Sequence, residues 1–558
     1  MISRRTFQVL LLANLLPGAA RARNSWVEQT LAKLSLEAKI GQLMMPMLES
    51  SEQADELVRR YGVGGFIIFR TAAQPLVRQL NRLQALSRLP LLVSADFERG
   101  AGAYIDGATD LPIAMALGAA NDPQLAYQAG TITALEARAL GVHVIFAPVL
   151  DINNNPHNPI INVRSFGESP DLVSRLAAAY IAGIEEHGAL ATIKHFPGHG
   201  NVSIDTHREF GAVRGRLREL EQVELKPYRQ VLAARAPHGL MAAHLWVEAI
   251  DSKPVPASLS RRVIGELLRR DLRFSGLVYT DSLGMQSVLD FAGDPGRAQR
   301  MAIEAGCDVL VTPTGRDAKG DPSPLAGVAA GMQAILQAVR RGQIRESRLD
   351  ASVRRILAAK ALLGLDRGAQ VDPAALASIV GTPAHQRTAQ QIARRALTLV
   401  QNRGGLLPLA AGQRLGVLTL TNFPGTGAFG RDSAEFAPAL QPARSLAWSV
   451  QPEAAELEAA RTLARDCEVL VVAAYLKVFV GDNSAGLLEA HRTALQQLLQ
   501  INPRIVFISF GSPYALAALR ELPVLICAYD NSKASQTAAA AALFSSAAWT
   551  GHLPVAIS

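Results

Sequence analysis

The chain has 558 residues, of which 49% are hydrophobic and 19% are charged, and its formal net charge is +8. This composition excludes a disordered chain, and the length predicts two or more folded domains. Lysine and arginine form no block with interleaved aromatic residues, so we expect no nucleic-acid partner.

Residues 1–22 have the pattern of an export signal. Arg4 and Arg5 precede a largely apolar run over 9–16, and Ala20-Arg21-Ala22 offers a cleavage site between small residues. The run is too short to span a membrane, and the paired arginines favour the twin-arginine route. We expect a periplasmic or secreted protein with no stable membrane insertion. Removal of the signal takes away three arginines and no acids, which lowers the net charge from +8 to +5.

Between residues 23 and 365, short apolar runs alternate with amphipathic segments. The expected strands span 62–69, 90–95, 142–148, 189–195, 239–244, 276–281 and 307–312. Helical segments such as 123–140, 170–187 and 216–234 separate them. Strands that are apolar throughout and separated by helices form a parallel sheet covered on both faces. Seven or eight such units predict a (β/α)8 TIM-type barrel.

Five of these strands lead into polar residues. They are Asp96-Phe97-Glu98-Arg99-Gly100, Asp151, Lys194-His195, His244 and Asp281-Ser282. In such a barrel the C-terminal strand ends meet at one mouth, where the active site lies. One polar strand end is ordinary, because loops are polar and helices need caps. Five in phase predict a site at that mouth.

The remainder of the chain predicts a linker and a second domain. Residues 366–397 are poor in strand signal and end in a helix expected over 386–397. A strand and turn are expected over 398–409, and further strands over 414–420, 469–474, 504–510 and 524–529, with helices over 453–467 and 487–500. Residues 398–558 therefore predict a second layered α/β domain.

The three cysteines are scattered along the chain. Cys307, Cys467 and Cys527 each lie inside or beside an apolar stretch. An odd, dispersed set gives no disulfide framework, so we expect buried free thiols.

Asp281 is the candidate nucleophile. It directly follows the apolar strand 276–280, and a carboxylate on a stiff strand can face a ligand, as a nucleophile must. A helix N-cap is the competing explanation of the same residue. The neighbouring polar strand ends favour the nucleophile.

The loop after Lys194-His195 holds a candidate acid/base pair, Asp205-x-His207. An aspartate bonded to one imidazole nitrogen fixes the tautomer and raises the basicity of the other nitrogen, which suits proton transfer near neutral pH. A surface loop with incidental charges is one alternative, and a metal site that also uses His195 and His199 is another. Pro197 interrupts the helix that would place those two histidines on one face, so we expect no metal.

Several strand-end residues could hold a polyhydroxylated ligand. Charge-assisted hydrogen bonds suit the hydroxyls of a carbohydrate. The candidates are Asp96, Asp151, Arg164, Lys194 and His195. Each could instead belong to a structural ion pair, and Asp151 is the first candidate for that role.

Together these motifs resemble a known family. K-H-F-P-G-H-G followed by D-T-H, F-A-P-V-L-D and R-S-F-G-E upstream, Y-T-D-S-L-G-M downstream, and L-V-Q-N-R-G-G-L-L-P-L in the linker are similar to glycoside hydrolase family 3. The D-T-H loop is similar to its β-N-acetylhexosaminidase branch. The resemblance covers nearly all of the chain after the signal.

The resemblance implies an α/β fold in which the barrel is followed by an α/β/α sandwich. It implies a retaining mechanism in which Asp281 is the nucleophile and His207, oriented by Asp205, is the acid/base. The implied sugar-binding residues are Asp96, Arg164, Lys194 and His195. The implied substrate is a terminal β-linked N-acetylglucosamine, typically on peptidoglycan fragments, with no cofactor and no metal.

One motif departs from the family pattern. Where many relatives have D-x-E-G-G-x-V-x-R, the chain reads D-F-E-R-G-A-G-A-Y, so Tyr104 stands where a sugar-binding arginine is usual. We expect no catalytic residue from the second domain. A β-glucosidase or xylosidase of the same family and a non-catalytic cell-wall sugar-binding protein remain alternatives, and the oligomeric state stays open.

Overall fold

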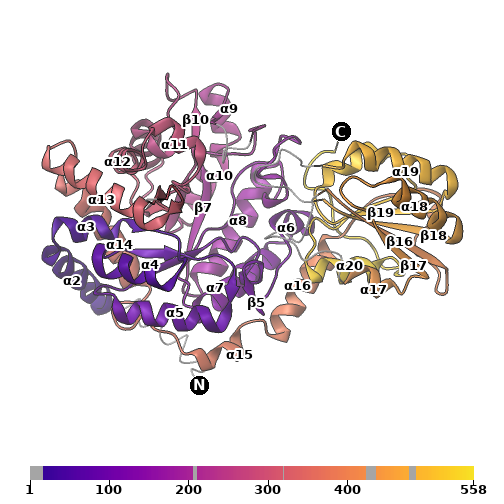
Figure 1. Cartoon of the computed structure of the whole chain (residues 1–558), viewed down its shortest axis with the longest axis horizontal. Helices are drawn as coiled ribbons and strands as arrows, with labels where there is room; N and C mark the ends of the chain where they lie inside the picture. Colours follow the sequence, from indigo (N-terminus) through magenta and orange to yellow (C-terminus); the bar gives the residue numbers. More distant parts are fainter. Residues whose placement is uncertain (1–16, 205–209, 318, 423–434, 477–485, 558) are drawn as a thin grey trace.

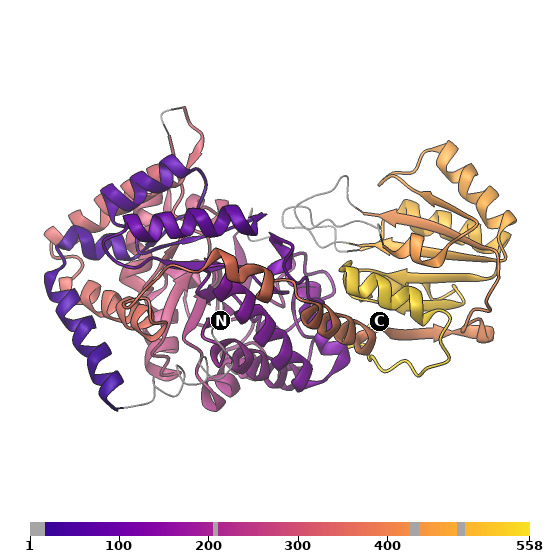
Figure 2. The same cartoon turned by 90° about the horizontal axis from the view of Figure 1, so that it is seen from below.

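The computed structural model describes residues 17–204, 210–317, 319–422, 435–476 and 486–557. It has two lobes, joined by a linker that crosses between them (Figures 1 and 2). Residues 1–16 of the predicted export signal, and the predicted pair Asp205 and His207, lie outside the described residues. In the described part of the chain, no helix combines the length and the apolar character that a membrane crossing needs.

The first lobe is a closed parallel barrel of eight strands within the described residues. They are β1 (Met44–Met45), β2 (Gly65–Ile67), β4 (Leu92–Ala95), β6 (Val144–Ile145), β7 (Leu190–Phe196), β9 (Gly239–Ala242), β11 (Leu277–Thr280) and β12 (Leu310–Val311). Six pair in the order β2-β4-β6-β7-β9-β11, and β1 pairs with β12. Single bridges, Met47 to Ile67 and Tyr279 to Val309, connect this pair to both edges of the six. The predicted barrel is confirmed.

All seven predicted barrel strands are present, although most are shorter than predicted. The eighth, β1, was not predicted. Only Leu43 separates its two residues from helix α3 (Leu36–Gln42), and Pro46 follows them, so no run of strand length marks it. The barrel closes through it because the backbone of Leu310 and Thr312 bonds to Leu43 and Met45.

Helices cover the outside of the barrel. They include α2 (Pro17–Lys33), α4 (Ser51–Glu56), α5 (Ala73–Leu86), α6 (Ala114–Ala120), α7 (Pro123–Ala139), α8 (Pro170–Glu185), α9 (Leu217–Gln222), α10 (Leu225–Ala234), α11 (Gln286–Ala292), α12 (Pro295–Ala305), α13 (Pro324–Arg340) and α14 (Glu346–Leu362). The predicted helices over 123–140 and 170–187 start as their sequences indicate, with a proline in the first turn and a side-chain cap from Asp122 or Ser169. The segment 216–234 forms two helices instead of the one predicted, with the break at Val223 and Glu224.

The second lobe is an α/β/α sandwich, as the resemblance implied. Its sheet has the order β15 (Thr398–Asn402), β20 (Val524–Cys527), β19 (Ile505–Ser509), β18 (Val469–Tyr475), β16 (Leu415–Thr421) and β17 (Arg444–Ala447). Only β15 pairs antiparallel among these strands. Helices α18 (Ala454–Asp466) and α19 (Glu489–Ile501) lie on one side, and α17 (Phe436–Leu440) and α20 (Lys533–Ala542) on the other (Figure 1). β17, α17 and α20 were not predicted.

The linker is tied to the barrel by one buried carboxylate. It contains α15 (Leu376–Ile379) and α16 (Pro383–Ala396). Glu136 of α7 is fully buried, accepts from the Gly381 amide at 2.9 Å, and lies 2.7 Å from Nδ1 of His385. The same carboxylate accepts from the amide and hydroxyl of Thr109 in the loop after β4. A mouth loop and the linker are therefore held by the same residue.

The chain end returns to the barrel. The His552 amide donates to Ala119 O at 3.1 Å, and the Ala556 amide donates to Glu168 at 2.9 Å. Tyr514 and Asn153 exchange two hydrogen bonds between the lobes, at 3.0 and 3.1 Å. These contacts hold the second lobe against the mouth of the barrel. The three cysteines are free and buried, as predicted.

Candidate active site

A cavity of about 410 Å³ opens at the C-terminal mouth of the barrel. Its lining contains five of the predicted site residues, Asp96, Arg164, Lys194, His195 and Asp281, but not Asp151. The prediction that polar strand ends share one mouth is confirmed for these residues. The second lobe completes the wall with Leu476, Phe510, Gly511, Tyr529, Asp530 and Asn531.

Lys194 is the centre of the charge network on the barrel side. Its ammonium group lies 2.7 Å from Asp96 and 2.7 Å from Glu98, and its side chain is only 2% exposed. Burial alone would lower the pKa of Lys194, but these two carboxylates outweigh burial and raise its pKa above the usual value. Lys194 therefore stays charged, and it fixes two carboxylates at the edge of the cavity.

Arg164 binds Glu98 in a two-pronged pair. Its Nε and Nη2 donate to the two Glu98 oxygens at 2.9 and 2.7 Å, and Nη1 donates to Ile160 O at 3.1 Å. Burial would raise the pKa of Glu98, but the charges of Arg164 and Lys194 hold it well below its usual range. Glu98 is therefore ionised and central, although the sequence motif alone gave it no role.

Asp151 orients two histidines from below the cavity. It is fully buried, its carboxylate lies 2.7 Å from His195 Nδ1, and it accepts from the His199 amide at 2.7 Å. The short contact places the ring proton of His195 on Nδ1, from which it donates a hydrogen bond to Asp151. The other ring nitrogen, Nε2, can then accept a hydrogen bond from Arg164, 3.3 Å away. Burial would raise the pKa of Asp151, but His195 and His199 hold it below its usual value. The structural role considered for Asp151 fits these contacts.

Asp281 stands at the end of β11 and lines the cavity. Its amide donates to Ala242 O at 2.9 Å, and its Oδ1 accepts from the Ser282 amide at 2.7 Å. The next helix, α11, has Met285 at its N-cap position, so Asp281 does not cap that helix. The competing explanation as a helix cap is therefore wrong.

His244 is a polar strand end that does not line the cavity. It is buried, with Nδ1 at 2.6 Å from the Ser258 hydroxyl and Nε2 at 2.9 Å from Ser282 O. Since Ser282 directly follows Asp281, His244 supports the backbone beside the candidate nucleophile. The prediction that all five polar strand ends face the cavity is corrected at His244 and also at Asp151, which is fully buried and does not line the cavity.

The described segments on either side of the predicted acid/base loop are each held by contacts. Asn158 donates to His199 O at 2.8 Å and to Gly200 O at 2.9 Å, which fixes the start of the loop. After the loop, the Phe210 ring stacks on Phe291 with 6.0 Å between centroids. Burial lowers the pKa of His199 to about 4, so this cavity-lining imidazole is neutral at neutral pH. The roles of Asp205 and His207 themselves stay predictions.

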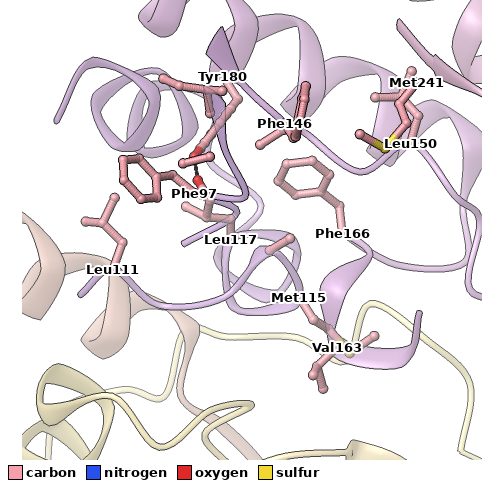
Figure 3. Close-up of a cluster of buried hydrophobic side chains, with 14 of the residues drawn as sticks. Phe97, Leu111, Met115, Leu117, Phe146, Leu150, Val163, Phe166, Tyr180 and Met241 are labelled. Carbon is pink, nitrogen blue, oxygen red and sulfur yellow. Dashed lines mark hydrogen bonds between the residues drawn. The ribbon is translucent and has the colours of Figure 1, made fainter. Parts of the chain in front are cut away.

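In the segment Asp96-Phe97-Glu98, the side chains alternate between the cavity and the core. Asp96 and Glu98 face the cavity, whereas Phe97 between them is fully buried. Figure 3 shows Phe97 in a cluster with Tyr180 and Leu111, and the Tyr180 hydroxyl donates to Phe97 O at 3.4 Å. This alternation holds both carboxylates on a rigid base.

The wall from the second lobe was not predicted. Asp530 accepts from the Ile113 amide across the lobe boundary at 2.7 Å. Burial would lower the pKa of Arg99, but Asp110 and Asp530 keep it raised. Whether the second lobe supplies no catalytic group stays a prediction, but it does shape the cavity.

Two family models match the chain. Residues 35–359 match the glycosyl hydrolase family 3 N terminal domain, and residues 397–558 match the glycosyl hydrolase family 3 C-terminal domain. A beta-hexosaminidase A from Pseudoalteromonas piscicida is 32% identical over 380 residues, which cover 64% of this chain. The chain spans 62% of the length of that relative.

Solved structures share both lobes. The structure of a glycoside hydrolase family 3 beta-N-acetylglucosaminidase from Paenibacillus sp. str. FPU-7 is 31% identical, with a TM-score of 0.84 over 94% of this chain and 99% of that chain. A beta-glucoside phosphorylase structure is 27% identical, with a TM-score of 0.86 over 97% of both chains.

Proposed function

The chain belongs to glycosyl hydrolase family 3, and from that premise we propose that it is an exported, exo-acting, retaining β-N-acetylglucosaminidase. The proposed substrate is a terminal β-linked N-acetylglucosamine, carried by a glycoside or a peptidoglycan fragment. The names of the hexosaminidase from Pseudoalteromonas piscicida and of the glucosaminidase from Paenibacillus support this substrate class.

The placement of Asp281 carries the proposal. In the closed order β1-β2-β4-β6-β7-β9-β11-β12, β4 is the third strand and β11 the seventh, so they lie opposite each other. Asp96 directly follows β4 and Asp281 directly follows β11, and both line one cavity. A pyranose across the mouth would place its anomeric carbon at Asp281 and its far edge at Asp96 and Lys194. In this pose the polar edge would meet the non-reducing end of the sugar, which supports exo action on a terminal residue.

In the proposed reaction, an Asp281 oxygen forms a bond to the anomeric carbon as the bond to the leaving oxygen breaks. His207, oriented by Asp205, gives its proton to that leaving oxygen. The same imidazole then takes a proton from water, which attacks the anomeric carbon and releases Asp281. Lys194, Arg164 and His195 hold the ring hydroxyls throughout, because charge-assisted hydrogen bonds fix orientation.

Phosphate is a possible alternative to water, because the structural neighbour with a TM-score of 0.86 is a beta-glucoside phosphorylase. Among the described residues the cavity charges favour water. The lining has four carboxylates, Asp96, Glu98, Asp281 and Asp530, and three cations, Arg99, Arg164 and Lys194. Each of these cations already forms an ion pair with a carboxylate. An attacking phosphate dianion would therefore meet a net negative wall.

A pre-steady-state assay tests the proposed function. An aryl N-acetylglucosaminide should give a burst of aryl alcohol equal to the enzyme concentration, because the glycosyl-enzyme forms faster than it breaks down. A slow fluorinated N-acetylglucosaminyl substrate should leave its sugar on the peptide that contains Asp281. A sugar on another peptide, or no turnover by the folded protein, would overturn the proposal. Turnover that rises with phosphate and yields the sugar phosphate would replace hydrolysis with phosphorolysis.

A panel of aryl glycosides that differ only at the 2-position separates the remaining alternatives. Preference for the 2-acetamido sugar supports the proposal, and preference for glucose or xylose supports a glucosidase or xylosidase. Sugar affinity without turnover of any glycoside supports a binding protein. Export is proposed on the signal-like residues 1–22, and N-terminal sequencing of the protein from the periplasm or medium tests it. An N-terminus at Met1 would contradict cleavage.

A further inference from the structure

Tyr104 lies in the cavity on a loop whose backbone is fixed. Its amide donates to Ala101 O, and the Thr71 amide donates to Tyr104 O, each at 3.1 Å. Its ring lies between Phe97, at 6.3 Å between centroids, and Phe69, at 6.4 Å. Phe97 belongs to the core, whereas Phe69 is 37% exposed at the rim of the cavity. The ring is therefore held in place from the inner and outer sides.

The hydroxyl of Tyr104 makes no hydrogen bond to any residue in the described part of the chain. Tyr529, which also lines the cavity, instead shares a 2.7 Å hydrogen bond with Thr398. Burial and the carboxylates of Asp96 and Glu98 raise the pKa of Tyr104, so it remains a neutral phenol. The cavity thus contains a fixed, neutral hydrogen-bonding group close to two carboxylates.

The arginine on the same loop does not fill this position. Arg99 forms an ion pair with Asp110 at 3.3 Å, and Asp530 of the second lobe also interacts with its charge. Its guanidinium is thus directed to the boundary between the lobes. On this loop the cavity is therefore lined by the phenol of Tyr104, while the cation of Arg99 is engaged elsewhere.

We propose that Tyr104 is a specificity-determining residue whose hydroxyl binds the C4 hydroxyl of the terminal sugar, beside Asp96. The strand order supports the choice of this hydroxyl. C4 lies across the pyranose ring from the anomeric carbon, and β4 lies across the barrel from β11, which carries Asp281. A neutral phenol adds a hydrogen bond at this edge without adding a positive charge, so Asp96 and Glu98 keep Lys194 and Arg164 as their cations.

A cycle of two enzymes and two substrates tests the assignment. Tyr104→Phe removes the hydroxyl and keeps the ring between Phe97 and Phe69. We expect kcat/KM for an aryl β-N-acetylglucosaminide to fall about 5- to 10-fold, as for loss of one neutral hydrogen bond, and to change less than about 2-fold for the 4-deoxy analogue. Equal losses on both substrates, or coupling to a 3-deoxy or 6-deoxy analogue instead, would overturn the C4 assignment.

Two further variants separate contact from structural damage. Tyr127→Phe removes a hydroxyl that bonds Glu186 on the surface of α7 and α8, and it should leave all these ratios unchanged. Tyr104→Arg returns a hydrogen-bond donor to this loop. It should recover part of the kcat/KM that Tyr104→Phe loses, on the 4-hydroxy substrate only. Failure to recover it would show that the site needs the phenol itself, and recovery on the 4-deoxy substrate as well would contradict a C4 contact.

Because this assignment rests on the proposed function, the wild-type enzyme is measured first. If the wild type turns over no N-acetylglucosaminide, the proposed function fails, and the assignment of Tyr104 fails with it. If the wild type is active and the cycle shows no coupling, the assignment of Tyr104 alone fails. Equal unfolding temperatures of wild type and Tyr104→Phe would show that the variant loses activity without losing stability.

Discussion

The barrel has a buried cluster of charges at each end, and the two differ in where their hydrogen bonds go. At the N-terminal end, just before β12, Asp308 is fully buried. It accepts four hydrogen bonds, from Arg269 Nη2 (2.5 Å), Arg355 Nη1 (3.0 Å), the Ser352 hydroxyl (2.5 Å) and the Val278 amide (3.0 Å). The protein itself supplies every one of these donors.

At the mouth, the carboxylates are only partly satisfied from within. The side chains of Asp96 and Glu98 are 26% and 16% exposed, and both line the cavity beside Lys194. Removing one partner from charges that are closed off inside the protein leaves an uncompensated buried charge and costs stability, whereas charges that face a cavity can hold a ligand in one orientation. The comparison predicts that variants at the two ends change different measurements.

The largest expected effect is at the mouth, for Asp281→Asn. We expect kcat to fall on the order of 10³-fold or more, because the amide cannot form the glycosyl-enzyme. Asparagine can keep the acceptor for the Ser282 amide, so the unfolding temperature should change little. Steady-state kinetics and thermal unfolding measure the two effects. Normal turnover in this variant would remove the proposed mechanism.

At the opposite end of the barrel, Asp308→Asn should lower stability and leave activity nearly unchanged. An amide cannot accept all four hydrogen bonds and leaves the surrounding arginines without their counter-charge, which we expect to lower the free energy of unfolding by about 3 kcal/mol. The kcat of the folded variant should stay within about 2-fold of wild type, because the residue lies at the end of the barrel away from the site. Denaturant unfolding and kinetics below the transition test this pair. Unchanged stability would contradict the comparison.

The sequence predicted this division in part, because strand-end position carries information about function. Asp281 follows β11 and Lys194 lies near the C-terminal end of β7, and in a parallel barrel these positions place both residues at the mouth. Asp308 lies inside the strand predicted over 307–312, and no role was predicted for it. In the structure β12 begins at Leu310, so Asp308 comes before the strand, at the other end of the barrel. The position of a residue before or after a strand can be read from the sequence only where the start of the strand is predicted correctly.

Contacts between distant segments could not be read in that way. Asp530 meets Ile113 across more than 400 residues, and no local pattern marks the pair. The role of Glu98 depends on Lys194 and Arg164, which come from other strands and loops. β1 was missed because its two residues carry too little periodicity to distinguish a strand.

A pH experiment sharpens the comparison at the mouth. The pKa of His199 is lowered by burial to about 4, so the folded protein binds this proton only near pH 4, whereas the unfolded chain binds it below about 6.5. The contribution of neutral His199 to the free energy of unfolding is therefore complete above pH 6.5. It is lost as the pH falls toward 4, by at most about 3 kcal/mol. His199→Gln should flatten this part of the stability curve. Equal slopes for wild type and variant between pH 6.5 and 4 would contradict the assignment.

The smallest expected effect, and the strictest test of the comparison, is at Asp151. This residue lies below the mouth, yet it is as fully buried as Asp308 and bonds only within the protein in the described part of the chain. Asp151→Asn should lower the free energy of unfolding by about 1–2 kcal/mol, through weaker bonds to His195 and His199.

Asp151→Asn should also lower kcat/KM by about 10-fold, mainly through KM, because an amide no longer fixes the His195 tautomer that accepts from Arg164. Glycoside kinetics and denaturant unfolding of the same preparation measure both effects. A loss of stability with unchanged kcat/KM would place Asp151 with Asp308 as a purely structural carboxylate. A fall in KM together with the loss of stability would show that His195 does not bind the sugar in the orientation that Asp151 imposes.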